Sequence, residues 1–299
     1  MENRAVENGV RSTESVNVSC DVWSCKNSDS SSADHLVIMV HGILGSNTDW
    51  KFGAEQFVRT LPDKVFVHCS EKNMFRLTLD GIDVMGDRLA EEVLEVIQRK
   101  PNLQKISFVA HSVGGLVARY AIGRLYRPPK KENVEDSTDG TSIDDLKATI
   151  GGLEPMNFIT VATPHLGSRG NKQSLFLCSL DENCLDIVGW RTSSIRRNVE
   201  LPKWEDYINK EYPHIVYEEH CKACDTEQSE LISTDDDSFD KLEEELVTGL
   251  SRLSWEKVDA SFHTCRQRFA AHSVIQVKDQ SMHIEGADVV QHMIDHFLL

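Results

Sequence analysis

Long hydrophobic runs are absent from this sequence of 299 residues. No stretch reaches the roughly 18 consecutive apolar residues that a membrane-spanning helix needs, so we expect no such helix. The first 15 residues lack an apolar core behind a basic start, and they contain three glutamates. Both features argue against a secretory signal or a transit peptide, and the expected location is cytoplasmic.

Positive charge is also scarce. The chain has 32 Lys and Arg against 48 Asp and Glu, which gives a formal net charge of −16. Nucleic acids are bound through concentrated Lys and Arg, so this balance argues against a nucleic acid partner. It argues equally against simple electrostatic docking on anionic lipid. Much of the acid lies in residues 218–245, which leaves the remaining chain closer to neutral.

The eight cysteines lack the dense spacing of a small secreted domain, and we interpret them as free thiols. Cys221 and Cys224 form a CxxC pair, with His220 beside it and His214 upstream. Two thiolates and an imidazole suit zinc. Because one such pair without a second is a weak signal, we predict no bound metal.

Short apolar runs alternate with helical periodicity along most of the chain. The runs that predict strands are residues 36–40, 65–68, 106–109, 158–161 and 274–277. The periodic segments that predict helices are residues 49–60, 83–100, 116–126, 239–253 and 286–298. This alternation predicts an α/β fold with a doubly wound, mostly parallel sheet and helices on both faces.

We expect one domain over residues 35–299. Residues 1–34 are polar and are interpreted as a mobile N-terminal segment, with an alternating patch at residues 16–22 that suits an edge strand. The composition of residues 128–150 indicates a surface insertion. Residues 218–240 are interpreted as an acidic loop, because such a composition buries too little apolar surface to fold alone.

The strongest chemical signal is the pattern Ala-His-Ser-Val-Gly at residues 110–114, between an expected strand and an expected helix. A nucleophile elbow is a sharp strand-to-helix turn that requires small residues two positions before and after the nucleophile. Gly114 meets this requirement, and Ala110 stands where glycine is usual. The helix N-terminus adds partial positive charge. Ser112 is therefore the candidate nucleophile.

A second signal is the sequence HGILGS at residues 41–46, directly after the first expected buried strand. A serine hydrolase needs two backbone N–H groups aimed at the developing oxyanion. One comes from the residue after the nucleophile, here Val113, and the other from a loop of this kind. Ile43 is the first candidate for the second donor, and Leu44 is the alternative.

His283 is the candidate general base among the twelve histidines. It follows the expected last strand and precedes the closing helix, and the base comes last in the chain order serine, acid, histidine. His41, His111 and His165 lie in loops that we expect around the pocket, where they would shape it.

Together, HGILGS, AHSVGG, VATPHLGSRG and MHIEGADVVQHMIDHF resemble the lipase-like serine esterases of the α/β-hydrolase superfamily. Residues 187–207 resemble the plant branch of that family. The resemblance covers most of residues 35–299. It implies an acyl ester hydrolase that acts on lipids without a cofactor or metal, with Ser112 as nucleophile and His283 as base.

The chain departs from this family where the catalytic acid is expected. In the family, a lid-like insertion and a further strand precede the acid, which lies just before the counterpart of residues 187–190. Here only residues 171–188 occupy that interval, too few for a helix and a strand. We interpret the chain as lacking part of the lid and one strand. Asp186, one position from the expected place, is the first candidate acid, and Asp181 is the second.

The sequence thus predicts a serine hydrolase that cleaves carboxylic esters of lipids or similar acyl substrates through an acyl-enzyme. The alternative is a catalytically weak or inactive protein of the same fold that binds a ligand or protein partner, because fold alone does not guarantee function. A lipid or acyl ester is the expected partner, with peripheral contact to a membrane or lipid droplet. The sequence does not specify the head group or acyl length of the substrate, or the oligomeric state of the protein.

Overall fold

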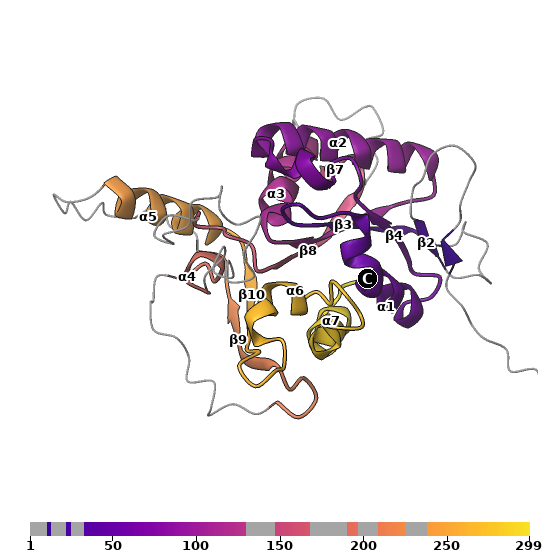
Figure 1. Ribbon diagram of the computed structural model, residues 1–299. Helices are drawn as coiled ribbons and strands as arrows, with labels where there is room; N and C mark the ends of the chain where they lie inside the picture. Colours follow the sequence, from indigo (N-terminus) through magenta and orange to yellow (C-terminus); the bar gives the residue numbers. More distant parts are fainter. Residues whose placement is uncertain are drawn as a thin grey trace, which may run out of the picture. The chain divides into compact units, whose positions relative to one another are not determined.

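The computed structural model describes residues 11–12, 22–24, 33–129, 147–167, 190–196, 209–224 and 238–299 (Figure 1). Most of the expected N-terminal segment, surface insertion and acidic loop lies outside the described residues, as do both candidate acids, Asp186 and Asp181. The chain divides into two compact units, Met1–Val161 with Met293–Leu299, and Ala162–His292. Each unit is described by itself.

A six-stranded sheet organises the first unit, in the order β1-β2-β4-β3-β5-β8. Its strands are β1 (Arg11–Ser12), β2 (Val22–Ser24), β3 (His35–Val40), β4 (Val65–Cys69), β5 (Lys105–His111) and β8 (Glu154–Val161). The last four are parallel, whereas β2 is antiparallel to β4 and to β1. Every residue of β3 and β4 is buried, as expected of strands covered on both faces.

Helices cover both faces of this sheet. The main helices are α1 (Lys51–Thr60), α2 (Ile82–Arg99) and α3 (Val113–Leu125). In Figure 1, α2 and α3 lie together on one face and α1 lies on the other. Leu89, Val93 and Val96 of α2 recur every three or four residues and share one core with Leu36 and Ile38 of β3. The first unit has the mostly parallel, doubly wound sheet of the α/β-hydrolase fold that the sequence predicted.

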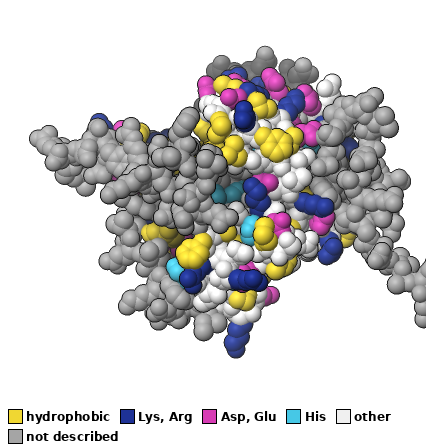
Figure 2. All heavy atoms as spheres, in the orientation of Figure 1, with side chains coloured by type: hydrophobic (Ala, Val, Ile, Leu, Met, Phe, Trp, Pro, Cys, Tyr) yellow, Lys and Arg dark blue, Asp and Glu magenta, His cyan; other side chains and the backbone are white. Residues whose placement is uncertain are grey.

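Short elements complete the first unit. They are the 3-10 helices η1 (Asn47–Trp50) and η2 (Phe75–Leu79) and the strand pair β6 (Tyr126–Arg127) and β7 (Thr149–Ile150). No helix in the described part of the chain is both long and apolar enough to cross a bilayer. On the face shown in Figure 2, acidic, basic and hydrophobic side chains are interspersed.

A two-stranded antiparallel sheet organises the second unit. It pairs β9 (Ile215–Cys221) with β10 (Trp255–Ala260). The helices are α4 (Trp190–Ser193), α5 (Ser238–Leu250), η5 (Arg268–Ala270), α6 (Ala271–Val274), η6 (Ile284–Gly286) and α7 (Ala287–Asp295), the last three residues of which belong to the first unit. The sequence predicted α5 and α7 but not the β9–β10 pair, and residues 218–221 of the expected acidic loop belong to β9.

The strand expected at residues 274–277 is wrong. Val274 ends the short helix α6, and Val277 follows in a turn where its N–H donates to the Val274 carbonyl at 2.9 Å. Both valines are buried, with exposed fractions of 0% and 1%. A four-residue apolar run does not distinguish a strand from a buried helical turn, and here the two valines share one face at a spacing of three.

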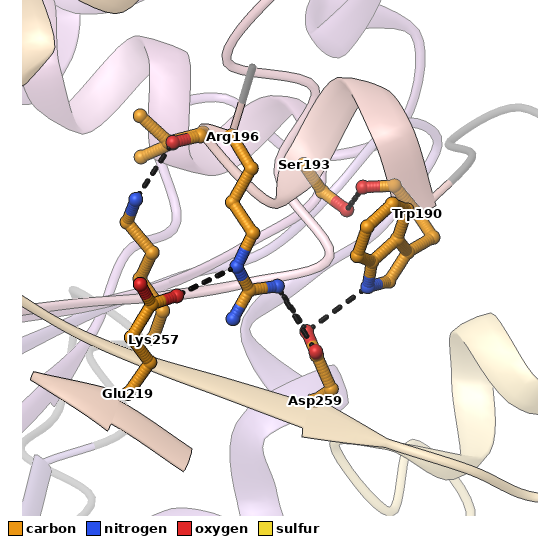
Figure 3. A network of polar contacts seen from close by, with 7 residues as sticks. Trp190, Ser193, Arg196, Glu219, Lys257 and Asp259 are labelled. Carbon is orange, nitrogen blue, oxygen red and sulfur yellow. Dashed lines mark hydrogen bonds and ion pairs between the residues drawn. The ribbon is translucent and has the colours of Figure 1, made fainter. Parts of the chain in front are cut away.

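A partly buried arginine joins the segment around α4 to the β9–β10 sheet (Figure 3). Arg196 donates to both oxygens of Asp259 at 2.8 and 2.9 Å and to Glu219 at 3.0 Å. Trp190 donates its indole N–H to Asp259 at 3.0 Å. The guanidinium holds the pKa of Glu219 below its usual range. Trp190 and Arg196 belong to the segment that resembles the plant branch. Their hydrogen bonds to Asp259 give both residues a structural role.

A buried histidine–glutamate pair lies in the first unit. His68 of β4 contacts Glu92 of α2 at 2.8 Å between Nε2 and Oε1, with side chains 1% and 3% exposed. Glu92 also accepts hydrogen bonds from the Ser70 hydroxyl at 2.7 Å and the Glu71 N–H at 2.8 Å. Burial alone would raise the pKa of Glu92, but His68 and these donors lower it below its usual value. The network therefore favours the charged carboxylate.

His35 makes the stability of the first unit depend on pH. Its ring bonds the Ser107 hydroxyl at 2.7 Å, and burial, with a smaller effect of Lys105, lowers its pKa from 6.5 to about 4. Between these values the unfolded chain binds more protons, so stability falls as pH drops from about 6.5 to about 4. Wild type should therefore lose more free energy of unfolding on acidification than His35→Gln does, by about 2–3 kcal/mol.

Urea unfolding of wild type and His35→Gln at pH 7 and at pH 4.5 measures the effect. His272, whose pKa burial also lowers to about 4, keeps its own contribution in both proteins. Equal losses of stability in the two proteins would contradict the assignment to His35.

Candidate active site

The order of the parallel strands reverses between β3 and β5. From β3 the chain goes to β4 on one side and then returns to β5 on the other. In open α/β sheets, ligands bind outside the carboxyl ends of the strands at such a switch point. The loop 41–46 follows β3 and Ser112 follows β5, so both sequence signals lie at this point of the sheet.

Ser112 has a strained backbone. Its φ is +56° and its ψ is −134°, a sparsely populated combination for a residue other than glycine. Its N–H donates to the Val161 carbonyl at 2.9 Å, and its own carbonyl accepts from the Gly115 N–H at 3.0 Å. These bonds hold Ser112 between the end of β5 and the start of α3, with Val113 as the first helical residue.

Two glycines let the loop 41–46 approach this turn. A β-carbon on Gly42 would lie 2.9 Å from the β-carbon of Ser112. A β-carbon on Gly114 would lie 2.4 Å from the His41 carbonyl oxygen and 2.9 Å from that of Val40. All three distances are shorter than real β-carbon contacts. The main chain at the end of β3 therefore requires glycine at position 114.

Two hydrogen bonds tie the loop to η2, and a third within η2 connects them. The Leu44 N–H donates to the Thr78 hydroxyl at 2.7 Å, and that hydroxyl donates to the Phe75 carbonyl at 2.6 Å. The Phe75 N–H in turn donates to the Gly45 carbonyl at 2.8 Å. Because the Leu44 amide is committed to Thr78, Ile43 is the better candidate for the second oxyanion donor.

His283 lies in the second unit, directly before η6, and is buried. The ring Nδ1 of His283 accepts a hydrogen bond from the Asp279 main-chain N–H at 3.1 Å. The main-chain N–H of His283 donates to the Asp279 carbonyl at 2.8 Å. With Nδ1 as an acceptor, the neutral ring carries its proton on Nε2. Burial lowers the pKa of His283, although the charge of Asp279 opposes this.

The turn that carries His283 is packed tightly. The Asp279 carboxylate accepts the Ser281 N–H at 2.8 Å, the Ser281 hydroxyl at 2.6 Å and the Met282 N–H at 3.1 Å. On the other side, a β-carbon on Gly286 would lie 1.9 Å from the Val274 carbonyl oxygen. The position of His283 before the closing helix was predicted, but the last strand expected before it is replaced by α6 and turns.

The structure thus brings together the site residues of the first unit. Ser112, Val113 and Ile43 lie at one end of the sheet, on segments in direct contact. His283 belongs to the other unit. His41, His111 and His165 are buried, and His41 Nδ1 donates to the Gly42 carbonyl at 3.0 Å.

One of the zinc ligands considered in the sequence has other contacts: His214 bonds Asp288 and Cys265. Among the described residues, Cys69, Cys221, Cys224 and Cys265 form no disulfide.

A family model matches this chain. The model described as "Putative serine esterase (DUF676)" matches residues 30–185, which contain the loop 41–46 and Ser112. The chain belongs to this family. His283 and the β9–β10 sheet lie beyond the matched residues of the family model.

Curated proteins from two yeasts are similar to this chain. "Putative lipase ROG1" of Saccharomyces cerevisiae is 30% identical over 137 residues, which are 44% of this chain and 17% of that protein. "Putative lipase YDR444W" of the same yeast is 28% identical over 199 residues, 63% of this chain and 26% of that protein. "Putative lipase C4A8.10" of Schizosaccharomyces pombe is 30% identical over 148 residues. The matched part of this chain therefore spans about a quarter or less of these relatives.

Solved structures overlap with about half of the chain. The lipase BlEst2 of Bacillus licheniformis in its mature form has a TM-score of 0.32 and 20% identity, covering 48% of this chain and 46% of that one. The RedJ thioesterase of Streptomyces coelicolor has a TM-score of 0.30 and 18% identity, with coverage of 48% and 46%.

Proposed function

We propose that this protein is a serine hydrolase that cleaves carboxylic esters of lipids or similar acyl substrates. The observation that carries the proposal is the strained backbone of Ser112 between β5 and α3, at the switch point of the sheet. Such a turn presents a serine hydroxyl at the edge of the sheet beside the N–H groups of a helix N-terminus. The family to which the chain belongs supports the same reaction class.

In the proposed mechanism, Ser112 Oγ attacks the acyl carbonyl carbon while His283 accepts the hydroxyl proton. The N–H groups of Val113 and Ile43 hold the oxyanion. The alcohol leaves with the proton from His283, and water then hydrolyses the acyl-enzyme by the same route. Asp186, with Asp181 as second choice, is the proposed acid that orients the imidazole.

An apolar rim on the loop 41–46 and η2 supports an acyl substrate. The rim consists of Leu44, Phe75, Leu77 and Leu79, with exposed fractions of 50%, 61%, 46% and 58%. Leu44 and Phe75 also have positive φ, at 52° and 56°. The hydrogen bonds between the loop 41–46 and η2 hold these side chains on adjoining segments. Exposed apolar side chains grouped in this way favour binding of an apolar chain.

We expect the rim to select for acyl length. Leu44→Ser and Phe75→Ser should lower kcat/KM for a long-chain ester about tenfold, because each removes apolar contact area worth about 1–2 kcal/mol, and should leave a short-chain ester nearly unchanged. The measurement is hydrolysis of a series of chromogenic esters of increasing chain length. Leu94→Ser, on the exposed side of α2, is the matched control. If kcat/KM fell by the same factor for every acyl chain length, the result would contradict a binding role for the rim.

A fluorophosphonate probe tests the mechanism directly. We expect covalent labelling of folded wild-type protein at Ser112, located by peptide mass spectrometry, and none in Ser112→Ala. Ser254→Ala, at an exposed serine of the second unit, should label like wild type. Failure of folded wild-type protein to label would overturn the proposed nucleophile.

A second candidate function is a weak or inactive hydrolase-fold protein that binds a ligand or partner. The bond from the Asp279 N–H to His283 Nδ1 favours it, because Nδ1 is the atom that a catalytic acid has to engage. A base with its proton on Nε2 cannot accept one from serine. Ester turnover that is lost in Ser112→Ala and in Asp186→Asn, but kept in Asp181→Asn, would reject this alternative.

A further inference from the structure

Three side chains from distant parts of the second unit meet at one end of the β9–β10 sheet. His214 directly precedes β9, Cys265 follows β10 by five residues, and Asp288 lies in the first turn of α7. The antiparallel register pairs Ala260 with Ile215, and the Ser261 N–H donates to the His214 carbonyl at 2.8 Å. The sheet therefore brings the segments of His214 and Cys265 together.

The imidazole of His214 is held in one orientation. Asp288 accepts the ring Nδ1–H at 2.9 Å through one oxygen and the His214 main-chain N–H at 2.7 Å through the other. Phe262 stacks on the ring, with centroids 5.0 Å apart and planes at 23°. Because Nδ1 donates to a carboxylate, the lone pair of the neutral ring is on Nε2.

Nε2 of His214 lies 3.0 Å from the Sγ of Cys265. The Nε2 lone pair is therefore within hydrogen-bond distance of the thiol, and thiol, imidazole and carboxylate are in contact in that order. The Glu285 carboxylate is a second hydrogen-bond partner of the thiol. Burial raises the pKa of the Cys265 thiol to about 11, and the charges of Glu285 and Asp288 add to the effect. The thiol is protonated at neutral pH, so its reaction as a nucleophile needs a base, and His214 is in place to supply one.

We propose that Cys265 is a thiol that reacts with hydrogen peroxide, with His214 as its general base and Asp288 as the positioning residue. In this step, sulfur attacks one peroxide oxygen, an S–O bond forms and the O–O bond breaks. The thiol proton passes to His214 Nε2 and then to the departing hydroxide, which leaves as water. The thiol is oxidised by two electrons to a sulfenic acid, and the peroxide is reduced.

Hydrogen peroxide fits this site better than a bulkier electrophile. Cys265 is only 6% exposed, which admits a small oxidant more readily than a large one. Hydroxide is also a poor leaving group, and the same imidazole that removes the thiol proton can deliver it to the departing oxygen. The reaction does not require Ser112, so it stands independently of the proposed esterase activity.

The experiment measures sulfenic acid formation at each cysteine of the intact protein. Folded protein is treated with hydrogen peroxide for set times, catalase removes the oxidant, and the protein is then unfolded in the presence of dimedone. Peptide mass spectrometry gives the rate of sulfenic acid formation at Cys265 and at the exposed Cys224. We expect His214→Gln to slow labelling of Cys265 about 100-fold at pH 7 while Cys224 is unchanged. Asp288→Asn should slow it about tenfold, because the ring loses its orienting charge.

A pH series separates base assistance from a structural effect. In His214→Gln the reaction depends on free thiolate, so its rate at Cys265 should rise about tenfold per pH unit towards the raised pKa of the thiol. In wild type we expect a much weaker rise above pH 7. Thermal melting shows whether each variant is folded at the assay temperature. Labelling of Cys265 that is absent in wild type, or equal in wild type and folded His214→Gln, overturns the proposal.

Discussion

Alanine at position 114 is expected to slow fluorophosphonate labelling of Ser112 by about 100-fold, because displacing a reacting group by about 1 Å has a cost of this order. The added methyl would lie 2.4 Å from the His41 carbonyl oxygen, and main-chain atoms on both sides must move to admit it. The movement separates the loop 41–46 from the turn that carries Ser112. Gly114→Ala should also lower the free energy of unfolding by about 1–3 kcal/mol, as overpacking does.

Gly123 provides a matched control on the same helix. A β-carbon at Gly123 would meet no atom within 4 Å. Gly123→Ala should therefore leave labelling of Ser112 unchanged and stabilise the protein by about 0.5–1 kcal/mol, because alanine favours the helix. Urea unfolding and labelling rates measure both effects. Similar behaviour of the two variants would show that close packing at position 114 does not position Ser112.

Removal of the Glu92 carboxylate is expected to cost about 3–5 kcal/mol of stability, because it leaves His68 and two hydrogen-bond donors buried without their acceptor. Glu92→Ala also removes packing between α2 and β4. The neighbouring Glu91 is exposed, so Glu91→Ala should change stability by less than about 0.5 kcal/mol. Chemical unfolding at pH 7 gives both values.

A double variant distinguishes charge from packing. His68→Leu with Glu92→Leu removes both polar partners and keeps apolar volume, and we expect it to be more stable than Glu92→Ala. If the double variant were the less stable protein, lost packing or the remaining polar groups around Ser70 would explain the result better than an uncompensated buried histidine.

The sequence predicted the first unit well because its signals are local. An apolar run such as residues 36–40 is typical of a strand that is buried on both faces of a parallel sheet. The spacing of apolar residues within α2 is enough by itself to predict a helix. The strained turn at Ser112 was also predictable, since a small-residue motif between a strand and a helix has few other structural explanations.

The second unit was harder to predict because its contacts join distant residues. β9 and β10 are mixed in polarity and separated by α5, and neither has the strict alternation of apolar and polar residues that marks a strand. His214 suggested a zinc ligand beside the CxxC pair, whereas the structure gives it Cys265 and Asp288, 51 and 74 positions away. The tautomer of His283 depends on one main-chain amide, which no sequence pattern specifies.

The bond from the Ser112 amide to Val161 has an evolutionary consequence. Val161 is the residue at which the first unit gives way to the second, so the backbone that strains Ser112 is complete within the first. Insertions and deletions after this point leave β5, α3 and the Val161 carbonyl in place. The second unit can therefore vary in length without disturbing the backbone conformation of Ser112.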